Sequence, residues 1–203
     1  VSLAARFYDA TEGEVLIDGV NVKDYSFDAL YDRIGYVTQR AILFSGDIRS
    51  NVLFGRSRGG TSDPDVQSAL DLAQATEFVS KLPGGLKAPI AQGGTNVSGG
   101  QKQRLSIARA LARKPEILIF DDSFSALDYR TDAKLRGGLA NQLQNTTRMI
   151  VAQRIGTIRD ADKIIVLDEG RMVGIGTHEE LMKSCPVYQE IARSQLSSEE
   201  LGA

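Results

Sequence analysis

Residues 97–112 read VSGGQKQRLSIARALA, and residues 117–122, shortly after them, read ILIFDD. In the first segment, two glycines precede apolar side chains that recur at helical spacing, so it predicts a helix that begins near Ser98. Ser98 and Gln101 have the spacing of a helix capping box. The second segment is short, apolar and rich in β-branched residues, which is typical of a buried parallel strand. A helix followed by a buried strand that ends in two carboxylates indicates an α/β fold.

Other short apolar runs predict further buried parallel strands of the same kind. A polar side chain follows three of the predicted strands: Gln39, Asp121 and Gln153. In open α/β sheets the ligand lies in a crevice outside the carboxyl ends of the strands, so these positions indicate a binding site. The additional predicted strands cover residues 34–38, 149–152 and 164–167.

The domain organisation expected from these patterns is a core interrupted by an insert. Residues 42–114 carry apolar side chains at helical spacing with few strand signals, so they predict a helical insert. The core then comprises residues 1–41 and 115–193, and residues 194–203 form a polar tail. The sequence shows no internal repeat and no linker that would separate two independent domains.

Composition excludes several classes of protein. The chain has 203 residues, of which 42% are hydrophobic, so it can bury a core. With 24 basic and 26 acidic residues, its formal charge of −2 supplies no general attraction for nucleic acid, and no nucleic-acid partner is expected. The single cysteine, Cys185, excludes a disulfide framework and favours an intracellular setting. No apolar run approaches the roughly 20 residues that span a bilayer.

The start of the helix at Ser98 suits an anion. Glycines allow a phosphate to approach the free backbone N–H groups of the first turn, and the positive end of the helix dipole favours negative charge. An ordinary helix cap would give the same short pattern, so Ser98 and Gln101 alone do not decide between the two interpretations.

The longer string is more specific. Residues 97–111 and 117–122 resemble the signature motif and Walker B strand of ABC-type ATPases, and residues 44–52 are similar to the exporter branch of that family. The resemblance extends over nearly the whole chain, and it implies the nucleotide-binding domain of an ABC exporter. The implied fold is a P-loop NTPase core with a parallel sheet and an inserted ABC helical subdomain. Three more segments resemble the Q-loop, D-loop and switch loop: residues 36–39, 125–128 and 151–154.

The resemblance also implies cofactors, partners and roles. The cofactors would be ATP and Mg²⁺, with Asp121 and Gln39 supplying oxygen atoms to the cation. Asp128 would serve contact with a second ABC nucleotide-binding domain. The domain would lie on the cytoplasmic face of a membrane, against the coupling helices of a transmembrane domain. The residues that would bind the γ-phosphate of a nucleotide held by that second domain are Ser98, Gly99, Gly100 and Gln101.

Two catalytic positions depart from the family pattern. Asp122 stands where the family places the glutamate that polarises the attacking water, which retracts the carboxylate by about 1.5 Å. A misplacement near 1 Å can cost about 10²-fold in rate. Gln153 stands where a histidine is usual; an amide donates a hydrogen bond but does not titrate near neutral pH. We therefore expect an impaired half-site within a heterodimer.

A third departure concerns the phosphate-binding loop. No Gly-x-x-x-x-Gly-Lys-Ser/Thr sequence, the loop that cradles phosphates in P-loop ATPases, occurs in the chain. Residues 1–8 resemble the second half of the helix that follows this loop. The expectation is a fragment that lacks the Walker A segment and the strands before it, binds ATP poorly by itself and exposes unpaired strand edges.

Two other interpretations of these motifs stay open. A soluble ABC ATPase of translation or chromosome maintenance would use the same motifs, but the short gap between Gln39 and Ser98 holds no heptad repeat and the charge is near neutral. A non-hydrolysing regulatory partner would keep nucleotide binding alone.

The last part of the chain contains a predicted hairpin, a predicted helix and the single histidine. Residues 168–170 predict a hairpin turn, followed by a returning strand at 172–175 and a helix from Thr177. The only histidine, His178, falls in a predicted capping box of Thr177 with Glu180, so we expect it to be structural or exposed and not catalytic.

Overall fold

The computed structural model describes residues 1–55 and 62–195, and the chain divides into two compact units. The first unit is Val1–Val151 and the second is Ala152–Ala203. The expected insert at 42–114 is a different division of the chain, and its boundaries stay a prediction. Of the expected tail, residues 196–203 lie outside the described part.

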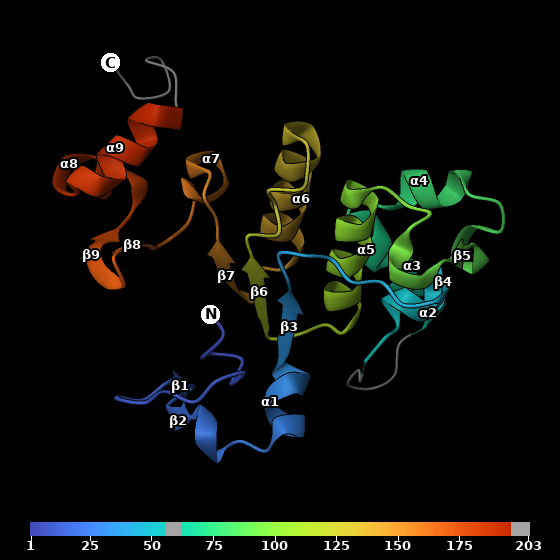
Figure 1. The fold of residues 1–203 in the computed structure, drawn as a ribbon, viewed down its shortest axis with the longest axis horizontal. Coiled ribbons are helices and arrows are strands. Elements are labelled where there is room, and N and C mark those ends of the chain that lie inside the picture. Colours follow the sequence, from blue (N-terminus) through green and yellow to red (C-terminus); the bar gives the residue numbers. More distant parts are fainter. Residues whose placement is uncertain (56–61, 196–203) are drawn as a thin grey trace. The chain divides into compact units, whose positions relative to one another are not determined.

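A three-stranded parallel sheet forms the centre of the first unit (Figure 1). Its strands are β3 (Ile34–Val37), β6 (Ile117–Asp121) and β7 (Thr147–Val151), and β6 lies in the middle. Their register places Tyr36 opposite Ile119, and Asp121 opposite Val151. The predicted α/β fold with a parallel sheet is therefore confirmed, and the predicted strand ends differ by one or two residues.

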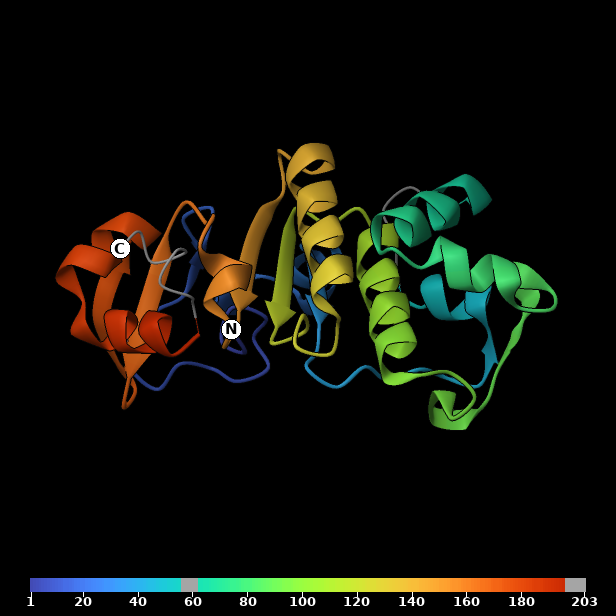
Figure 2. The ribbon, with the colours of Figure 1, turned by 90° about the horizontal axis from the view of Figure 1, so that it is seen from above.

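Side chains alternate between the two faces of this sheet, as the pleat requires. Leu118 and Phe120 belong to a large core that also contains Leu105 of helix α5 (Gly99–Ala112) and Leu135 of helix α6 (Tyr129–Gln142). Figure 2 shows α5 and α6 along the strands. On the other face, Ile119 packs in a smaller core. That core is completed by Ala5, Ile17, Val22, Leu30 and Ile34, with Tyr36 and Ile117 partly buried against it.

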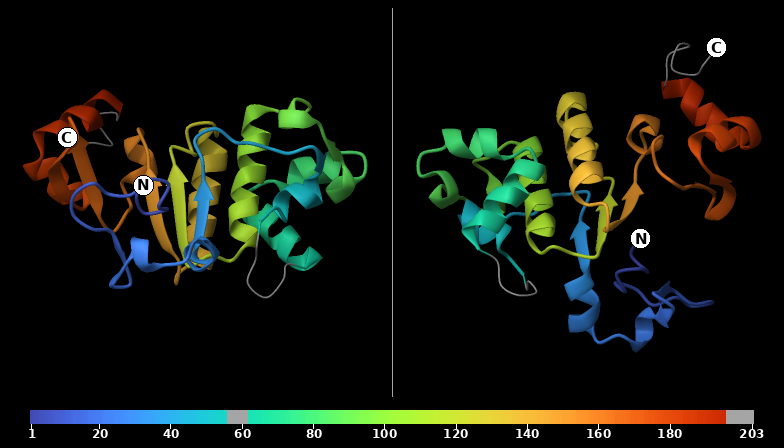
Figure 3. Two further views of the ribbon diagram at one scale, coloured as in Figure 1. Left: turned by 60° about the horizontal axis from the view of Figure 1, so that its bottom comes forward. Right: turned by 180° about the vertical axis from the view of Figure 1, so that it is seen from behind.

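The first part of the chain supplies the cover for this second face. A two-residue hairpin, β1 (Leu16–Ile17) with β2 (Val20–Asn21), is followed by the short helix η1 (Val22–Asp24) and helix α1 (Phe27–Arg33). Figure 3 shows these segments from two further sides.

The helix predicted for residues 1–8 is wrong. These residues form hydrogen-bonded turns, in which the N–H of Ala5 donates to the carbonyl of Val1 at 3.3 Å. Arg6 then adopts φ 51°, in the left-handed region. Forming the first helical turn costs free energy, which only further helical residues can offset, and here the left-handed Arg6 ends the run of turns.

Most of the residues between 42 and 114 that the structure describes are helical. The helices are α2 (Ile48–Val52), α3 (Asp63–Leu72), α4 (Thr76–Lys81), η2 (Gly85–Lys87), η3 (Gln92–Gly94) and α5. The sequence did not predict the short antiparallel pair of β4 (Gly46–Asp47) with β5 (Pro89–Ile90). Two-residue strands carry no periodicity to detect.

A partly buried arginine of α5 makes hydrogen bonds to this region. Arg109 donates to the carbonyls of Asn51 (2.8 Å) and Ile42 (2.8 Å) and to Oδ1 of Asn51 (3.1 Å). Its guanidinium also lies 5.3 Å from the ring centroid of Phe44 and 5.6 Å from that of Phe54. Burial lowers the pKa of Arg109 to about 10, so the side chain stays charged at neutral pH. The charge is held by carbonyls and aromatic faces.

The second unit pairs an antiparallel hairpin with helices. Strands β8 (Ile164–Asp168) and β9 (Arg171–Gly176) pair antiparallel. The strand predicted at 164–167 is therefore present, but the prediction that it pairs in parallel is wrong for its pairing with β9. The reason is the connecting turn, since Glu169 and Gly170 have φ of 46° and 75°, the geometry of a tight hairpin. The predicted returning strand is confirmed as β9. The helices of this unit are α7 (Ile155–Ile158), α8 (His178–Ser184) and α9 (Pro186–Gln195).

Thr177 caps α8 in a capping box with Glu180, as predicted. Among the residues that the structure describes, no helix has both the length and the apolar character needed to span a bilayer.

Asn51 supports the contact of α2 with α5, and its removal tests that support. Asn51 is buried; it accepts a hydrogen bond from the Phe44 N–H and donates to the Phe44 carbonyl. Asn51→Ala leaves the Phe44 N–H and the Arg109 guanidinium short of an acceptor. We expect it to lower the free energy of unfolding by about 2 kcal/mol or more, measured by urea denaturation.

Asn96→Ala is the matched control. Asn96 also bridges two backbone groups, the N–H of Ala91 and the carbonyl of Pro89, but it is exposed. Because water replaces its hydrogen bonds, the expected loss is under about 1 kcal/mol. Equal losses for the two variants would contradict the role given to Asn51.

Candidate functional site

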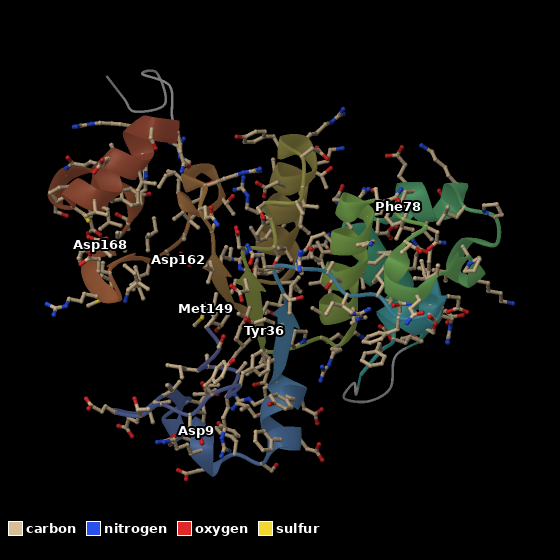
Figure 4. The ribbon with its side chains drawn as sticks, in the orientation of Figure 1. Asp9, Tyr36, Phe78, Met149, Asp162 and Asp168 are labelled. Atoms are coloured by element: carbon tan, nitrogen blue, oxygen red, sulfur yellow. The ribbon has the colours of Figure 1, made fainter. Side chains whose placement is uncertain are left out.

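Two hydrogen bonds join the end of β3 to the carboxylates at the end of β6. The hydroxyl of Tyr36 donates to Oδ2 of Asp121 at 2.7 Å, and the side-chain amide of Gln39 donates to Oδ2 of Asp122 at 3.0 Å. Figure 4 labels Tyr36 where β3 runs beside β6. The structure therefore brings together three residues that the sequence singled out, Gln39, Asp121 and Asp122, and adds Tyr36, which it did not.

Asp122 has an unusual backbone conformation. Its φ is 46°, in the left-handed region that non-glycine residues seldom adopt, and the residue is only 8% exposed. The conformation is held by two hydrogen bonds: its N–H donates to the carbonyl of Val151 at 3.0 Å, and the Ser125 hydroxyl donates to its carbonyl at 2.8 Å. Strained residues of this kind persist where the surroundings fix them, and they are concentrated at functional sites.

The environment of Tyr36 keeps its hydroxyl protonated. Burial, followed by the hydrogen bond to Asp121 and the charge of that carboxylate, raises the pKa of Tyr36 to about 12. The ring is also fixed, since Phe7 lies against it with a centroid separation of 5.0 Å. Tyr36 is therefore a permanent hydrogen-bond donor to Asp121 at neutral pH.

The donor atoms at this edge suit a hard cation. Carboxylate and amide oxygens are typical ligands of Mg²⁺, which usually takes one or two carboxylates and keeps water or phosphate oxygens as its other ligands. Because the Gln39 amide nitrogen faces Asp122, its amide oxygen can accept or coordinate elsewhere. In residues 1–55 and 62–195 no cluster of three or more His, Cys, Asp or Glu side chains could enclose a metal by itself. The site therefore fits Mg²⁺ that arrives with a phosphate ligand.

The predicted capping box at the start of α5 is present. The Ser98 hydroxyl oxygen accepts from the Gln101 N–H at 3.3 Å, and the Gln101 side chain accepts from the Ser98 N–H at 2.9 Å. A Cβ added at Gly99 would meet no atom within 4 Å, and one at Gly100 would lie 3.5 Å from the Ala126 carbonyl oxygen, an ordinary contact. Packing within the chain therefore does not require either glycine.

The remaining predicted residues have local partners. Asp128 caps α6, where it accepts from the N–H and the hydroxyl of Thr131 at 2.9 and 2.7 Å, and these bonds lower its pKa. Gln153 belongs to the second unit, where its carbonyl accepts from the Gln195 side chain at 2.8 Å.

Two further polar residues near the site were not predicted. The Gln103 side chain, 1% exposed, donates to the carbonyl of Thr38 at 3.2 Å, and the buried Ser123 hydroxyl donates to the carbonyl of Val37 at 2.8 Å. Both satisfy carbonyls where β3 leaves the sheet, and so fix the path that carries Gln39. The one signal in the sequence for Gln103 was its helical spacing to Ile107 and Ala110, which puts a polar side chain among apolar ones.

His178 makes a structural contact in the second unit. Its Nδ1 lies 2.8 Å from the hydroxyl of the buried Tyr188, and burial together with the charge of Arg159 lowers its pKa. This geometry agrees with the expectation that His178 is structural.

Curated proteins similar to the chain are ABC transporters. An uncharacterized ABC transporter ATP-binding protein of Mycobacterium tuberculosis is 46% identical over all of this chain and 34% of its own length. An ATP-dependent lipid A-core flippase of Albidiferax ferrireducens is 41% identical over 96% of the chain and 33% of the flippase. In Arabidopsis thaliana, ABC transporter B family member 21 is 38% identical over 96% of the chain and 15% of that protein. The chain thus spans about a third or less of the relatives it matches.

A solved structure and a family model agree with these relatives. The structure of a bacterial Atm1-family ABC exporter with ATP bound matches 97% of this chain and 34% of the exporter chain, with a TM-score of 0.90 and 36% identity. The family model described as ABC transporter matches residues 1–125, which include the hydrogen-bonded edge formed by Tyr36, Gln39 and the two carboxylates. With this model matching more than half of the chain and a relative 46% identical over all of it, the chain belongs to the ABC transporter family.

Proposed function

We propose that this chain is the ATP-binding part of an ABC exporter, at the cytoplasmic face of a membrane. The observation that carries the proposal is the edge of the sheet where Gln39 and Tyr36 contact two consecutive carboxylates. Export is supported by a relative described as a flippase and by a solved structure described as an exporter. The partners would be a transmembrane domain, through its coupling helices, and a second nucleotide-binding domain.

The residues at this edge would have different roles in the ATP site. Asp121 and the amide oxygen of Gln39 would hold the Mg²⁺ of MgATP. Mg²⁺ bound there would neutralise the charge that develops on the phosphates. Asp122 would orient the attacking water and accept its proton, and its hydrogen bond from Gln39 holds the carboxylate toward the same edge.

Hydrolysis at this chain's own site would be slow. Asp122 is one methylene shorter than glutamate, and its burial and left-handed backbone restrict any compensating movement. By the sequence resemblance, position 153 carries glutamine where a titrating imidazole is usual, and an amide does not titrate near neutral pH. We therefore propose that this half-site mainly binds nucleotide.

Ser98, Gly99, Gly100 and Gln101 would complete the site of the other nucleotide-binding domain. The argument for this assignment is steric. Packing within the chain does not require glycine at 99 or 100, so the space above this backbone is available to a ligand from outside. A phosphate at the start of α5 would receive backbone N–H donors and the favourable end of the helix dipole. The Ser98 hydroxyl accepts within the cap and keeps its hydrogen to donate. A heterodimer with one impaired and one competent site follows.

Lengthening the carboxylate tests the impaired half-site. Asp122→Glu in the full-length transporter restores the missing methylene, so we expect phosphate release to rise by up to about 10²-fold. Asp63→Glu is the control, since it adds the same methylene at an exposed position paired with Arg49. No change with Asp122→Glu would favour the alternative of a non-hydrolysing regulatory partner.

A methyl group added at Gly99 tests whether the first turn of α5 acts on the nucleotide of the other domain. A side chain at Gly99 is tolerated by the fold, so Gly99→Ala should leave the melting temperature unchanged while ATP hydrolysis by the assembled transporter falls about 10²-fold. Gly137→Ala in α6 is the control, because a Cβ there also meets no atom within 4 Å. Unaltered hydrolysis in Gly99→Ala would remove the basis for assigning this backbone to a phosphate.

A further inference from the structure

Of the four residues joined by the two hydrogen bonds at the carboxylate edge, Tyr36 is the one to which the motif resemblance gives no role. It lies on β3, two residues before the strand gives way to Thr38 and Gln39. The 2.7 Å hydrogen bond from its hydroxyl to Asp121 connects positions 85 residues apart in the sequence.

The sheet geometry accounts for this contact. Tyr36 is paired with Ile119 across the parallel ladder, and Asp121 follows Ile119 by two residues. Side chains two residues apart along a strand share a face, so Tyr36 and Asp121 lie on the same side of the sheet. Tyr36 is long enough to extend along that face to the next position on β6.

The ring has little freedom to leave this position. It packs against the core that contains Ile119 and Leu30, and Phe7 lies 5.0 Å from it at an interplanar angle of 56°. The hydroxyl is therefore directed at Asp121 by packing before any ligand binds.

We propose that Tyr36 is a positioning residue for the cation site, which holds Oδ2 of Asp121 and leaves Oδ1 as the oxygen offered to Mg²⁺. The proposal rests on the metal role given to Asp121 above. Within the described residues, Oδ2 accepts from Tyr36 and no hydrogen bond reaches Oδ1. Because one oxygen is engaged by a fixed donor, the carboxylate cannot rotate without breaking a charge-assisted hydrogen bond.

Tyr36, on β3, and Gln39, two residues beyond its end, then contact different carboxylates. Gln39 contacts Asp122, whereas Tyr36 contacts Asp121. Loss of the Tyr36 hydroxyl should weaken cation binding and leave the binding of metal-free nucleotide unchanged, a separation that a general loss of structure would not produce.

The test measures Mn²⁺ binding to the full-length transporter by electron paramagnetic resonance, in the presence of a non-hydrolysable ATP analogue. Asp121→Asn first identifies the bound Mn²⁺ that depends on this chain. For that Mn²⁺, Tyr36→Phe should raise the dissociation constant about 10-fold or more, since partners that orient metal-binding side chains typically contribute 10–100-fold to affinity. Binding of the analogue in EDTA should stay within twofold of wild type.

Tyr25→Phe is the matched control. The Tyr25 hydroxyl is partly buried in the same unit, donating to the carbonyl of Ile17 at 3.1 Å and accepting from Arg33 at 2.8 Å, but it contacts neither carboxylate. This variant should lower the melting temperature without changing Mn²⁺ affinity. An equal loss of Mn²⁺ affinity in both variants would overturn the proposal, because the effect would then be structural.

The outcomes separate this inference from the function on which it rests. If Asp121→Asn leaves Mn²⁺ binding intact, the metal role of Asp121 fails and the Tyr36 role fails with it. If Asp121→Asn removes a Mn²⁺ while Tyr36→Phe retains wild-type affinity, only the role of Tyr36 is overturned. Should Tyr36→Phe not fold, a fluorotyrosine placed at position 36 alone keeps the ring and alters donor strength, and an unchanged Mn²⁺ affinity would again overturn the proposal.

Discussion

The parallel pairing of β3 with β6 is the constraint on which the rest of the site depends. Its register sets Tyr36 beside Ile119, and this single alignment brings Tyr36 to Asp121 and brings Gln39, two residues beyond the end of β3, to Asp122. A shift of one residue would turn every side chain of β3 to the opposite face. The buried apolar side chains on both faces of the sheet make such a shift costly, since Val37 and Phe120 belong to one core and Ile34 and Ile119 to the other.

Helix α5 connects the carboxylate edge with Gly99 and Gly100, the segment proposed to meet a second domain. Near its start it offers Gly99 and Gly100 to the outside, and one turn later Gln103 donates to the carbonyl of Thr38. Toward its end, Arg109 holds the backbone of Asn51 and Ile42. Helix α5 therefore contacts the loop that carries Gln39 and the region around α2, and its own first turn is the backbone proposed to meet a second domain. Rigid elements of this kind position side chains more accurately than loops do.

The role proposed for Asp122 depends on how firmly its backbone is held. In a mobile segment, movement of the chain could make up for a carboxylate one methylene shorter than that of glutamate. Here the residue is buried, its backbone is left-handed and its N–H and carbonyl are both hydrogen-bonded, so the frame allows little compensation. The effect proposed for aspartate in place of glutamate at position 122 is therefore one of geometry around a fixed backbone, since both residues are carboxylates.

The sequence by itself determined the strands of the sheet, the cap at Ser98 and the motif residues Gln39, Asp121 and Asp122, because periodicity and capping are local properties of the chain. It gave the wrong structure for residues 1–8 and the wrong pairing for residues 164–167, where a left-handed Arg6 and the Glu169–Gly170 turn prevail over apolar pattern. Only the tertiary structure decided that Tyr36 contacts Asp121 and that Gln103 and Ser123 hold the end of β3. These contacts join residues far apart along the chain, and they depend on strand register and helix packing, which no local pattern specifies.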